Sequence, residues 1–477
     1  MSGPEIVTLG CRLNAAESEA MRVLAGDQDD LVIVNSCAVT SEAVRQAKKA
    51  IRSAAKRRPD ARILVTGCAA QIDPGYFAAM PEVAAVIGNR EKGLGASFLP
   101  PPSSQFLLPS SQRKLGSREA ERDACPNETP AFAGMTGKAG ATGRVGATSN
   151  AWTTDHAAKI HVSDIMSAHD TARHFAASFG TRARAFLEVQ NGCDHRCTFC
   201  IIPYGRGPSR SVPAGLVVDR VRALVDEGYD EVVLTGVDTT SYGPDLPGGQ
   251  TLGQLVERVL ALVPGLRRLR LSSLDSIEID DRLFDLVTGD ARVQPHLHLS
   301  LQSGDDMILK RMKRRHTRRQ AIEMVQRLKA ARPEIAIGAD LIAGFPTETE
   351  TQAANTIALL DEADIVFGHV FPYSPRAGTP AARMPQHDLA TIRARAKRLR
   401  DAADARRRRW LETLVGTRQS VLIEGESGYG HAANYAPARL ASGATRGRAG
   451  TNGVVVGDVV TLHITHVEDD MLVGETL

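Results

Sequence analysis

Three cysteines lie close together in the segment NGCDHRCTFC: Cys193, Cys197 and Cys200. Thiolates in a C-x3-C-x2-C pattern can hold three irons of a four-iron, four-sulfur cluster and leave the fourth iron open to a small molecule. The alternative is a zinc site with His195 as its fourth ligand. Structural zinc sites typically use C-x2-C pairs, however, and no second pair is nearby. The triplet therefore favours a catalytic iron–sulfur cluster.

Three further cysteines, Cys11, Cys37 and Cys68, each end a short apolar run. The runs IVTLGC, LVIVNSC and ILVTGC are typical of strands, and AAESEAMRVLA and SEAVRQAKKAIRSAAKR are typical of helices between them. This alternation predicts a parallel α/β sheet, at whose carboxyl edge the three cysteines would converge. Buried core cysteines are the alternative, but three at equivalent positions favour a second cluster.

Composition limits the class of protein. The 477 residues are 43% hydrophobic and carry a net charge of +3, and no apolar run reaches the roughly 18 residues of a membrane span. The N-terminal MSGPEIVTLGC lacks the pattern of a signal peptide. We therefore expect a multidomain cytoplasmic protein whose thiols stay reduced. With so small a net charge, any nucleic-acid surface must be local.

The segment 96–156 has a different character from its surroundings. It contains PPPSSQ, PSSQRKLGSREAERD and GKAGATGRVGATS, which are rich in Pro, Ser, Gly and charge and show no periodicity. A loop of this length and composition predicts a disordered insertion without a catalytic role. Cys125 lies within it and is interpreted as an idle thiol.

A strand–helix rhythm returns at about Arg184, with six candidate strands: AFLEVQ, EVVLT, RRLRL, HLHLS, IAIGAD and DIVFGHV. Six parallel βα units predict a partial barrel, whose chemistry lies at the carboxyl ends of the strands. Polar residues recur at or near those ends: Thr235, Gly236, Asp238, Ser273, Gln302 and Asp340. A loop or capping role is equally consistent with each of them alone, but together they mark the expected cofactor edge.

The last part of the chain combines a basic helix with short strands. The helix covers 391–415 and includes Arg406, Arg407 and Arg409, which could contact phosphate or form a solvated face. The runs QSVLIEG, YAPARLA, GVVVGDVVTLHITHV and MLVGETL then alternate with Gly-rich turns. They predict a small β-barrel, a fold that often binds oligonucleotides.

Several motifs carry a family resemblance. The segment CDHRCTFCIIPYGRG, with Phe199 before its last cysteine, resembles the radical S-adenosylmethionine (SAM) enzymes. Together with TLGCRLNAAES, VNSCAVTSEA, VTGCAAQ, SLQSGDDMILKRMKR and DLIAGFPTETE, it resembles the radical-SAM methylthiotransferases over nearly the whole chain except the insertion. SCAVT and LHLSLQSG are most similar to the MtaB-type branch, which acts on N6-threonylcarbamoyladenosine of tRNA. The chain reads SSLDS where that branch usually has a glutamate, and Asp238 where it often has a histidine.

The resemblance implies an α/β fold in three parts. It implies an N-terminal α/β domain (1–95), the insertion (96–156), a connector (157–183), a radical-SAM partial (βα)6 barrel (184–390), the basic helix (391–415) and a TRAM-like RNA-binding barrel (416–477).

The resemblance also implies two [4Fe-4S] clusters and SAM as cofactors. Cys11, Cys37 and Cys68 would bind an auxiliary cluster, and Cys193, Cys197 and Cys200 the catalytic cluster that cleaves SAM. Phe199, Thr235, Gly236, Asp238, Ser273, Gln302 and Asp340 are the expected cofactor contacts. The implied reaction converts N6-threonylcarbamoyladenosine at position 37 to its 2-methylthio derivative. The expected partners of a monomer are the anticodon arm of tRNA, a sulfur donor and a reducing electron donor.

Three alternative functions stay open on the sequence. The protein could methylthiolate isopentenyl-adenosine in tRNA, or it could modify an aspartate of a ribosomal protein. A more distant alternative is a non-catalytic iron–sulfur RNA-binding or sensor protein. Two separate three-cysteine sets disfavour the last, because a sensor needs only one cluster.

Overall fold

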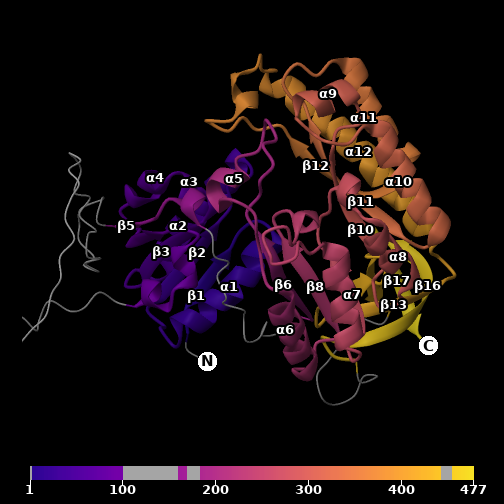
Figure 1. Cartoon of the computed structure of the whole chain (residues 1–477), viewed down its shortest axis with the longest axis horizontal. Coiled ribbons are helices and arrows are strands. Elements are labelled where there is room, and N and C mark those ends of the chain that lie inside the picture. The colour runs from indigo at the N-terminus through magenta and orange to yellow at the C-terminus, as the bar shows by residue number, and fades with distance from the viewer. Residues whose placement is uncertain (1–2, 100–158, 169–182, 442–453) are drawn as a thin grey trace, which may run out of the picture.

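The computed structural model describes residues 3–99, 159–168, 183–441 and 454–477. These residues form a mixed α/β structure with three parts that follow one another along the chain, from the indigo N-terminal sheet to the yellow C-terminal barrel (Figure 1). This confirms the expected fold class. Cys125 and residues 100–156 of the expected insertion lie outside the described residues.

The first part is a five-stranded parallel sheet in the order β1-β2-β3-β4-β5. Successive side chains of a strand point to opposite faces. Leu31 and Ile33 of β2 therefore pack with Met21 of α1 on one face, while Val32 and Val34 pack with the α2 side on the other. The elements are β1 (Glu5–Thr8), α1 (Arg12–Ala25), β2 (Leu31–Ser36), α2 (Ser41–Arg57), β3 (Arg62–Gly67), α3 (Cys68–Ile72), α4 (Pro74–Ala78), β4 (Ala85–Ile87) and β5 (Ile160–His161).

Two short segments around the expected insertion belong to this first part, and one of them reaches into its first residues, which are folded rather than disordered. Phe98, at the end of a 3-10 helix (Gly95–Phe98), is fully buried in the core beside α1. Strand β5 falls within the expected connector 157–183, and its residues Ile160 and His161 pair in parallel with Val86 and Ile87 of β4. The folded N-terminal part therefore uses residues on both sides of the insertion.

The second part contains the six parallel strands expected from the sequence: β6 (Arg184–Asn191), β8 (Glu231–Gly236), β9 (Arg268–Leu271), β10 (His296–Gln302), β11 (Ala336–Ala343) and β12 (Ile365–Pro372). Strands β6, β8 and β9 pair in that order, as do β10, β11 and β12, and a parallel bridge between Leu274 and Leu299 joins the two sets. A short strand β7 (Arg210–Ser211) adds to β6 in the antiparallel direction. The result is an open, partial barrel.

Helices follow the strands of the second part, and three of them begin with a capping box. The side chains of three residues, Thr251, Thr317 and Thr349, each accept a hydrogen bond from the backbone N–H of a glutamine three residues later. The side-chain oxygen of that glutamine accepts a hydrogen bond from the backbone N–H of the threonine. These polar pairs show where each helix starts. The helices are α5 (Ile202–Arg206), α6 (Ala214–Asp226), α7 (Leu252–Leu262), α8 (Asp281–Gly289), α9 (Asp306–Arg311), α10 (Arg318–Ala331) and α11 (Glu350–Glu362).

The third part is a closed five-stranded barrel in the order β13-β14-β15-β17-β16, reached through the long helix α12 (Leu389–Thr413). Leu411 of α12 is buried in the barrel core with Leu462 and Ile464. The strands are β13 (Arg418–Ile423), β14 (Tyr429–Ala432), β15 (Pro437–Leu440), β16 (Val459–Glu468) and β17 (Met471–Thr476). None of the helices within the described ranges is long and apolar enough to cross a membrane.

A buried charge cluster joins the partial barrel to the C-terminal barrel. Glu231 at the start of β8 is fully buried, and its carboxylate lies 3.2 Å from Arg184 Nε, 2.9 Å from Arg268 Nε and 3.0 Å from Arg270 Nε. Arg270 Nη1 also donates to the carbonyl of Ala433, 3.0 Å away in the C-terminal barrel. Burial would raise the pKa of Glu231, but the neighbouring guanidinium groups outweigh it and hold the pKa well below its ordinary value.

Replacing Glu231 by Gln should destabilise the chain strongly, because three buried guanidinium groups would lose their shared anion. We expect a loss of about 3–5 kcal/mol, the usual cost of breaking a buried ion pair, measured as a lower urea midpoint. Glu257→Gln is the matched control: its pair with Arg282 is exposed and should contribute no more than about 1 kcal/mol. Equal urea midpoints for the two variants would contradict the structural role of the cluster.

Candidate functional site

The first cysteine set lies at the carboxyl ends of three adjacent parallel strands, as expected. Cys11 precedes α1, Cys37 directly follows β2, and Cys68 begins α3 directly after β3. Cys37 and Cys68 are buried, whereas Cys11 is exposed at the surface of a cavity. Burial raises the pKa of Cys37 to about 11. A metal ion bound by this thiol would have to displace its proton.

Gly10 allows the chain to approach Cys37 closely. Its φ of 99° is a conformation that residues with a side chain rarely adopt, and a Cβ at this position would lie 2.7 Å from Cys37 Cβ and 3.0 Å from Cys37 Sγ. Only glycine therefore fits here, and it lets the turn before Cys11 fold against the second cysteine.

The second cysteine set lies in the loop between β6 and α5. The Cys200 amide donates to the Cys197 carbonyl over 3.1 Å, and the Cys193 amide donates to the Gly207 carbonyl over 3.1 Å. These bonds shape the loop, in which Cys200 interacts electrostatically with both Cys193 and Cys197. Burial raises the pKa of Cys200 to about 12. As in the first set, a metal ion would have to displace the thiol protons.

An arginine accompanies a sulfur in each set. Arg206 Nε lies 3.0 Å from Cys68 Sγ, and Arg314 Nη1 lies 3.6 Å from Cys197 Sγ. Arg314 is held in turn by Asp275, whose carboxylate lies 2.8 Å from Nη2. A fixed positive charge beside a sulfur suits a thiolate that binds metal. Asp275 lies within the SSLDS segment.

Arg206 also connects the two domains. It follows the second cysteine set in α5 and is 2% exposed, and its Nη2 donates to Asn14 Oδ1 over 2.6 Å and to Glu17 Oε2 over 3.0 Å. Glu17 lies on α1 and also pairs with Lys92 Nζ at 2.7 Å. Although burial would raise the pKa of Glu17, the two cations outweigh it and keep the pKa below its ordinary value. One guanidinium therefore ties the loop of the second set to the edge that carries the first.

A cavity of about 640 Å³ opens between the N-terminal sheet and the partial barrel. Cys11, Arg12 and Cys37 form part of one wall, and residues of β8, β10, β11 and β12 form the opposite wall. Of the expected cofactor contacts, six line this cavity: Phe199, Thr235, Gly236, Ser273, Gln302 and Asp340. Gln302 has a left-handed backbone with φ 70°, which is uncommon for a residue with a side chain.

Asp238 is placed differently from the other expected contacts. It is absent from the cavity lining among the described residues, and its carboxylate lies 2.9 Å from His195 Nε2 and 2.9 Å from Ser241 Oγ. The Cys193 thiol donates to it over 3.5 Å. Hydrogen bonds that His195 donates to the carboxylates of Asp238 and Glu278 raise the pKa of His195 to about 10. Asp238 thus contacts the cysteine loop itself.

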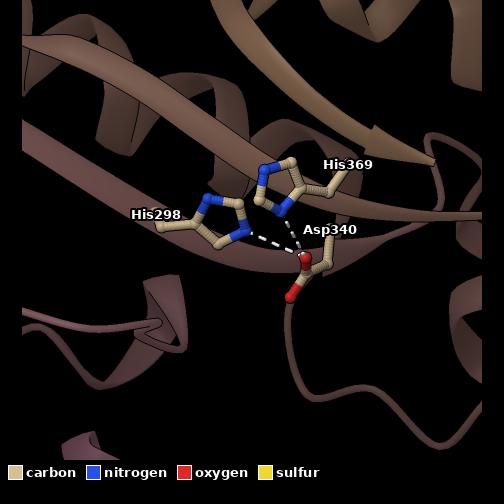
Figure 2. Close-up of side chains that lie close together, drawn as sticks. All are labelled: His298, Asp340 and His369. Atoms are coloured by element: carbon tan, nitrogen blue, oxygen red, sulfur yellow. Dashed lines mark hydrogen bonds and ion pairs between the residues drawn. The ribbon is translucent and has the colours of Figure 1, made fainter. Parts of the chain in front are cut away.

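Three polar side chains lie together on adjacent strands inside the cavity. His298 of β10, Asp340 of β11 and His369 of β12 all line it, and Figure 2 shows both imidazoles pointing at the carboxylate. Asp340 Oδ1 lies 2.9 Å from His298 Nε2 and 3.6 Å from His369 Nδ1. Gly338 makes room for this arrangement, because a Cβ there would lie 2.5 Å from His298 Nδ1.

Within the part of the chain that the structure describes, four groups of side chains could hold a metal. The two cysteine sets supply only thiols, and an arginine is close to a sulfur in each, which fits iron–sulfur clusters. The other groups are His298–Asp340–His369 and His195–Asp238–Glu278. In both of these, the carboxylate already has a histidine partner at 2.9 Å, so neither needs an ion to satisfy its charge.

Sequence reasoning missed several residues of this site. Arg206, Arg314, Arg12 and His369 lie at the cavity or against a cysteine. His369 could have been found, because it lies within a predicted strand at the same level as Asp340. The arginines gave no such signal, because the chain contains many.

Two protein families match separate parts of the chain. Residues 187–360 match the Radical SAM superfamily. Residues 4–88 match the uncharacterized protein family UPF0004, and this region corresponds to the N-terminal sheet. One match therefore contains Cys11, Cys37 and Cys68, and the other contains Cys193, Cys197 and Cys200.

Several curated relatives match most of the chain. A threonylcarbamoyladenosine tRNA methylthiotransferase MtaB of Rickettsia prowazekii is 46% identical, over 91% of this chain and 91% of the relative. The protein of that name from Bacillus subtilis is 33% identical over 79% of this chain and 74% of the relative. A tRNA-2-methylthio-N(6)-dimethylallyladenosine synthase of Ruegeria pomeroyi is 30% identical over 98% of this chain and 94% of the relative.

Replacing Arg206 by Met should lower the free energy of unfolding, since it leaves buried Glu17 and Asn14 without the donor that they share. We expect a loss of about 3–5 kcal/mol, measured as a lower midpoint in thermal unfolding of the metal-free chain. Arg196→Met is the control, because Arg196 is an exposed arginine of the cysteine loop. An Arg206 variant as stable as the Arg196 variant would show that the contact does not hold the domains together.

Proposed function

The chain belongs to the radical-SAM tRNA methylthiotransferases, and we propose that it converts N6-threonylcarbamoyladenosine at position 37 of tRNA to the 2-methylthio derivative. The observation that carries this choice of substrate is the 46% identity, over 91% of both chains, to a relative named for threonylcarbamoyladenosine. The relative named for dimethylallyladenosine is 30% identical. Isopentenyl-adenosine in tRNA and a ribosomal-protein aspartate are the alternative targets that the tests below would reveal.

A radical-SAM enzyme uses SAM and a [4Fe-4S] cluster, which together supply a 5′-deoxyadenosyl radical when bound. We propose two clusters in this chain. Cys193, Cys197 and Cys200 would hold the cluster that binds SAM, and Cys11, Cys37 and Cys68 the auxiliary cluster. Two observations support these assignments: the cysteines of each set lie near one another, and a guanidinium lies beside a sulfur of each set.

The cavity residues are proposed to orient SAM. The polar groups of the cavity wall would bind a ligand there through hydroxyl, amide and carboxylate groups. The residues concerned, which share the cavity with Cys11 and Cys37, are Phe199, Thr235, Gly236, Ser273, Gln302 and Asp340. Asp238 is proposed to act indirectly, without contacting SAM, by holding Cys193 and His195 in place. The apolar side chains Ile342 and Phe371 in the same lining would help to exclude water from the reacting groups.

The C-terminal barrel is proposed to bind the anticodon arm as a TRAM-like domain. Three arginines of α12 are weak candidates for phosphate contacts, because the chain already pairs them with carboxylates: Arg406 with Asp361 and Asp364, Arg407 with Asp404 and Asp470, and Arg409 with Asp361. The target base would have to leave the stack of the loop to reach the cavity, which costs less in a loop than in a duplex.

The two clusters can be tested separately by replacing cysteines. Anaerobically reconstituted protein should contain about eight irons, and the triple Ala variant of Cys193, Cys197 and Cys200 about four. Cys197→Ala should abolish SAM cleavage, whereas Cys37→Ala should still form 5′-deoxyadenosine but no methylthio product. Cys125→Ala is the matched control and should keep iron and activity. One cluster in the unaltered protein, or full product from the Cys37 variant, would refute the assignment.

The substrate can be identified from tRNA. Mass spectrometry of digested tRNA from cells without this gene should show loss of the 2-methylthio form of N6-threonylcarbamoyladenosine, restored by the intact gene and not by its Cys197→Ala variant. Loss of the dimethylallyl form instead would assign the protein to the other tRNA branch. Unchanged tRNA together with an unmodified ribosomal-protein aspartate would assign it to the protein-modifying relatives.

A further inference from the structure

Arg12 is a cation in the wall of the cavity that has no carboxylate partner among the described residues. It is half-buried and lines the cavity directly after Cys11. Its Nη2 donates to the Tyr435 hydroxyl over 3.0 Å. Among the described residues, no carboxylate lies within ion-pairing distance of its guanidinium, whereas Arg206 and Arg314 each pair with one. A partly desolvated charge without a counter-ion is costly, and its presence in a cavity points to an anionic ligand.

The surroundings of Arg12 fix its position. Tyr435 reaches from the C-terminal barrel with a left-handed backbone, φ 70°, and its ring stacks on His296 with a centroid distance of 4.7 Å. Arg12 Cζ lies 5.4 Å from the centre of that ring. Arg270 contacts the same ring, at 5.0 Å, but its charge is balanced by Glu231. Tyr435 therefore holds the Arg12 guanidinium without neutralising it.

The carboxylate in the cavity wall does not compensate for Arg12. Asp340 lies between His298 and His369, with the shorter contact 2.9 Å long (Figure 2). Burial would raise the pKa of Asp340, but the hydrogen bonds to the two histidines outweigh it and keep the group ionised. Its carboxylate oxygen thus contacts the two imidazoles, and it forms no ion pair with Arg12.

We propose that Arg12 binds the carboxylate of the threonylcarbamoyl group and so selects the modified adenosine, an inference that rests on the proposed function. The threonylcarbamoyl group ends in an amino-acid carboxylate, whereas a dimethylallyl group carries no charge. A guanidinium binds a carboxylate through two parallel N–H donors, which gives geometric selectivity as well as attraction. Arg12 lies in the cavity wall and can therefore distinguish the two substrates by the charge of the N6 substituent.

The position of Arg12 along the chain fits the chemistry of the base. In adenine, the carbon that receives sulfur, C2, and the substituted N6 flank N1 on the same, Watson–Crick edge. A base that presents C2 to the wall formed by Cys11 and Cys37 therefore presents its N6 substituent to that wall as well. Arg12 follows Cys11 directly and lines the same cavity. It is placed to bind the substituent while the cysteine set faces C2.

The same arrangement disfavours an apolar substituent. A dimethylallyl group at this position would displace water from Arg12 and give it no partner. A site built to hydrogen-bond a polar group rejects an analogue that lacks it, because the polar groups of the site are left unpaired. Specificity would therefore come from the cost of burying Arg12 against an uncharged substrate.

The test compares two anticodon stem-loop RNAs: one carrying N6-threonylcarbamoyladenosine, and the same RNA with its carboxylate converted to the uncharged carboxamide. With the reconstituted full-length protein, we expect kcat/KM for the methylthio product to be about 10- to 100-fold higher for the acid, the usual value of a charged hydrogen bond. Arg12→Gln should lower this ratio to near one by losing activity on the acid. Arg12→Lys should retain an intermediate ratio.

Further measurements separate a role of Arg12 in substrate selection from a role in assembling the clusters. The Arg12 variants should keep the iron content and the SAM cleavage of the unaltered protein, which excludes damage to the clusters. Arg22→Gln, at the other end of α1 where its side chain is half exposed, is the matched control and should keep the full ratio. An acid-to-carboxamide ratio near one in the unaltered protein overturns the proposal without any variant.

The outcomes distinguish this inference from the proposed function. If the unaltered protein methylthiolates the threonylcarbamoyl RNA and the Arg12→Gln variant keeps the same ratio, the role of Arg12 is wrong and the proposed function stands. If the unaltered protein acts on dimethylallyladenosine RNA and on neither threonylcarbamoyl form, the proposed function itself fails.

Discussion

The contact on which the rest of the site depends is the buried guanidinium of Arg206. It bonds to Cys68 Sγ at 3.0 Å on one side and to Asn14 and Glu17 of α1 on the other. Since Arg206 ends α5, the helix that follows the loop of the second cysteine set, its contacts tie that loop to the sheet edge that carries the first set. A lysine could not replace it, because one ammonium lacks the planar fork that reaches several acceptors. The cavity lies between the two domains that this contact helps to join.

A second buried charge cluster performs the same task at the other end of the partial barrel. Glu231 gathers Arg184, Arg268 and Arg270, and these arginines extend to the C-terminal barrel. Tyr435 enters the same region and touches both the second part and Arg12 of the first. The part proposed to bind tRNA is thus in contact with the residue proposed to bind the modified base. A shift of Tyr435 would change the position of Arg12.

The cavity divides its chemistry between its walls. One wall carries Cys11 and Cys37 with Arg12, and the opposite wall carries the ends of β8, β10 and β11. This division fits the proposed function, in which one side would hold the sulfur-bearing cluster while the other would orient SAM. The His298–Asp340–His369 group belongs to the second wall, where its carboxylate is already satisfied by imidazoles.

The sequence by itself determined the order of the three parts, the six strands of the partial barrel and the position of Cys11, Cys37 and Cys68 at one sheet edge. These features follow from local periodicity, because a strand or helix pattern is complete within a few neighbouring residues. The gathering of the expected contact residues at one edge was also predictable, since parallel strands place their carboxyl ends together. Six of the seven expected contacts line the cavity.

Only the tertiary structure decided which charged groups meet. Arg206 and Glu17 are 189 positions apart in the sequence, and Arg12 and Tyr435 are 423 apart. Their pairing depends on how whole domains pack, which no local pattern encodes. For the same reason Asp238 turned out to contact the cysteine loop, and the arginines of α12 turned out to be ion-paired. A charged side chain finds its partner through the fold, because electrostatic energy depends on distance in space and on burial rather than on sequence spacing.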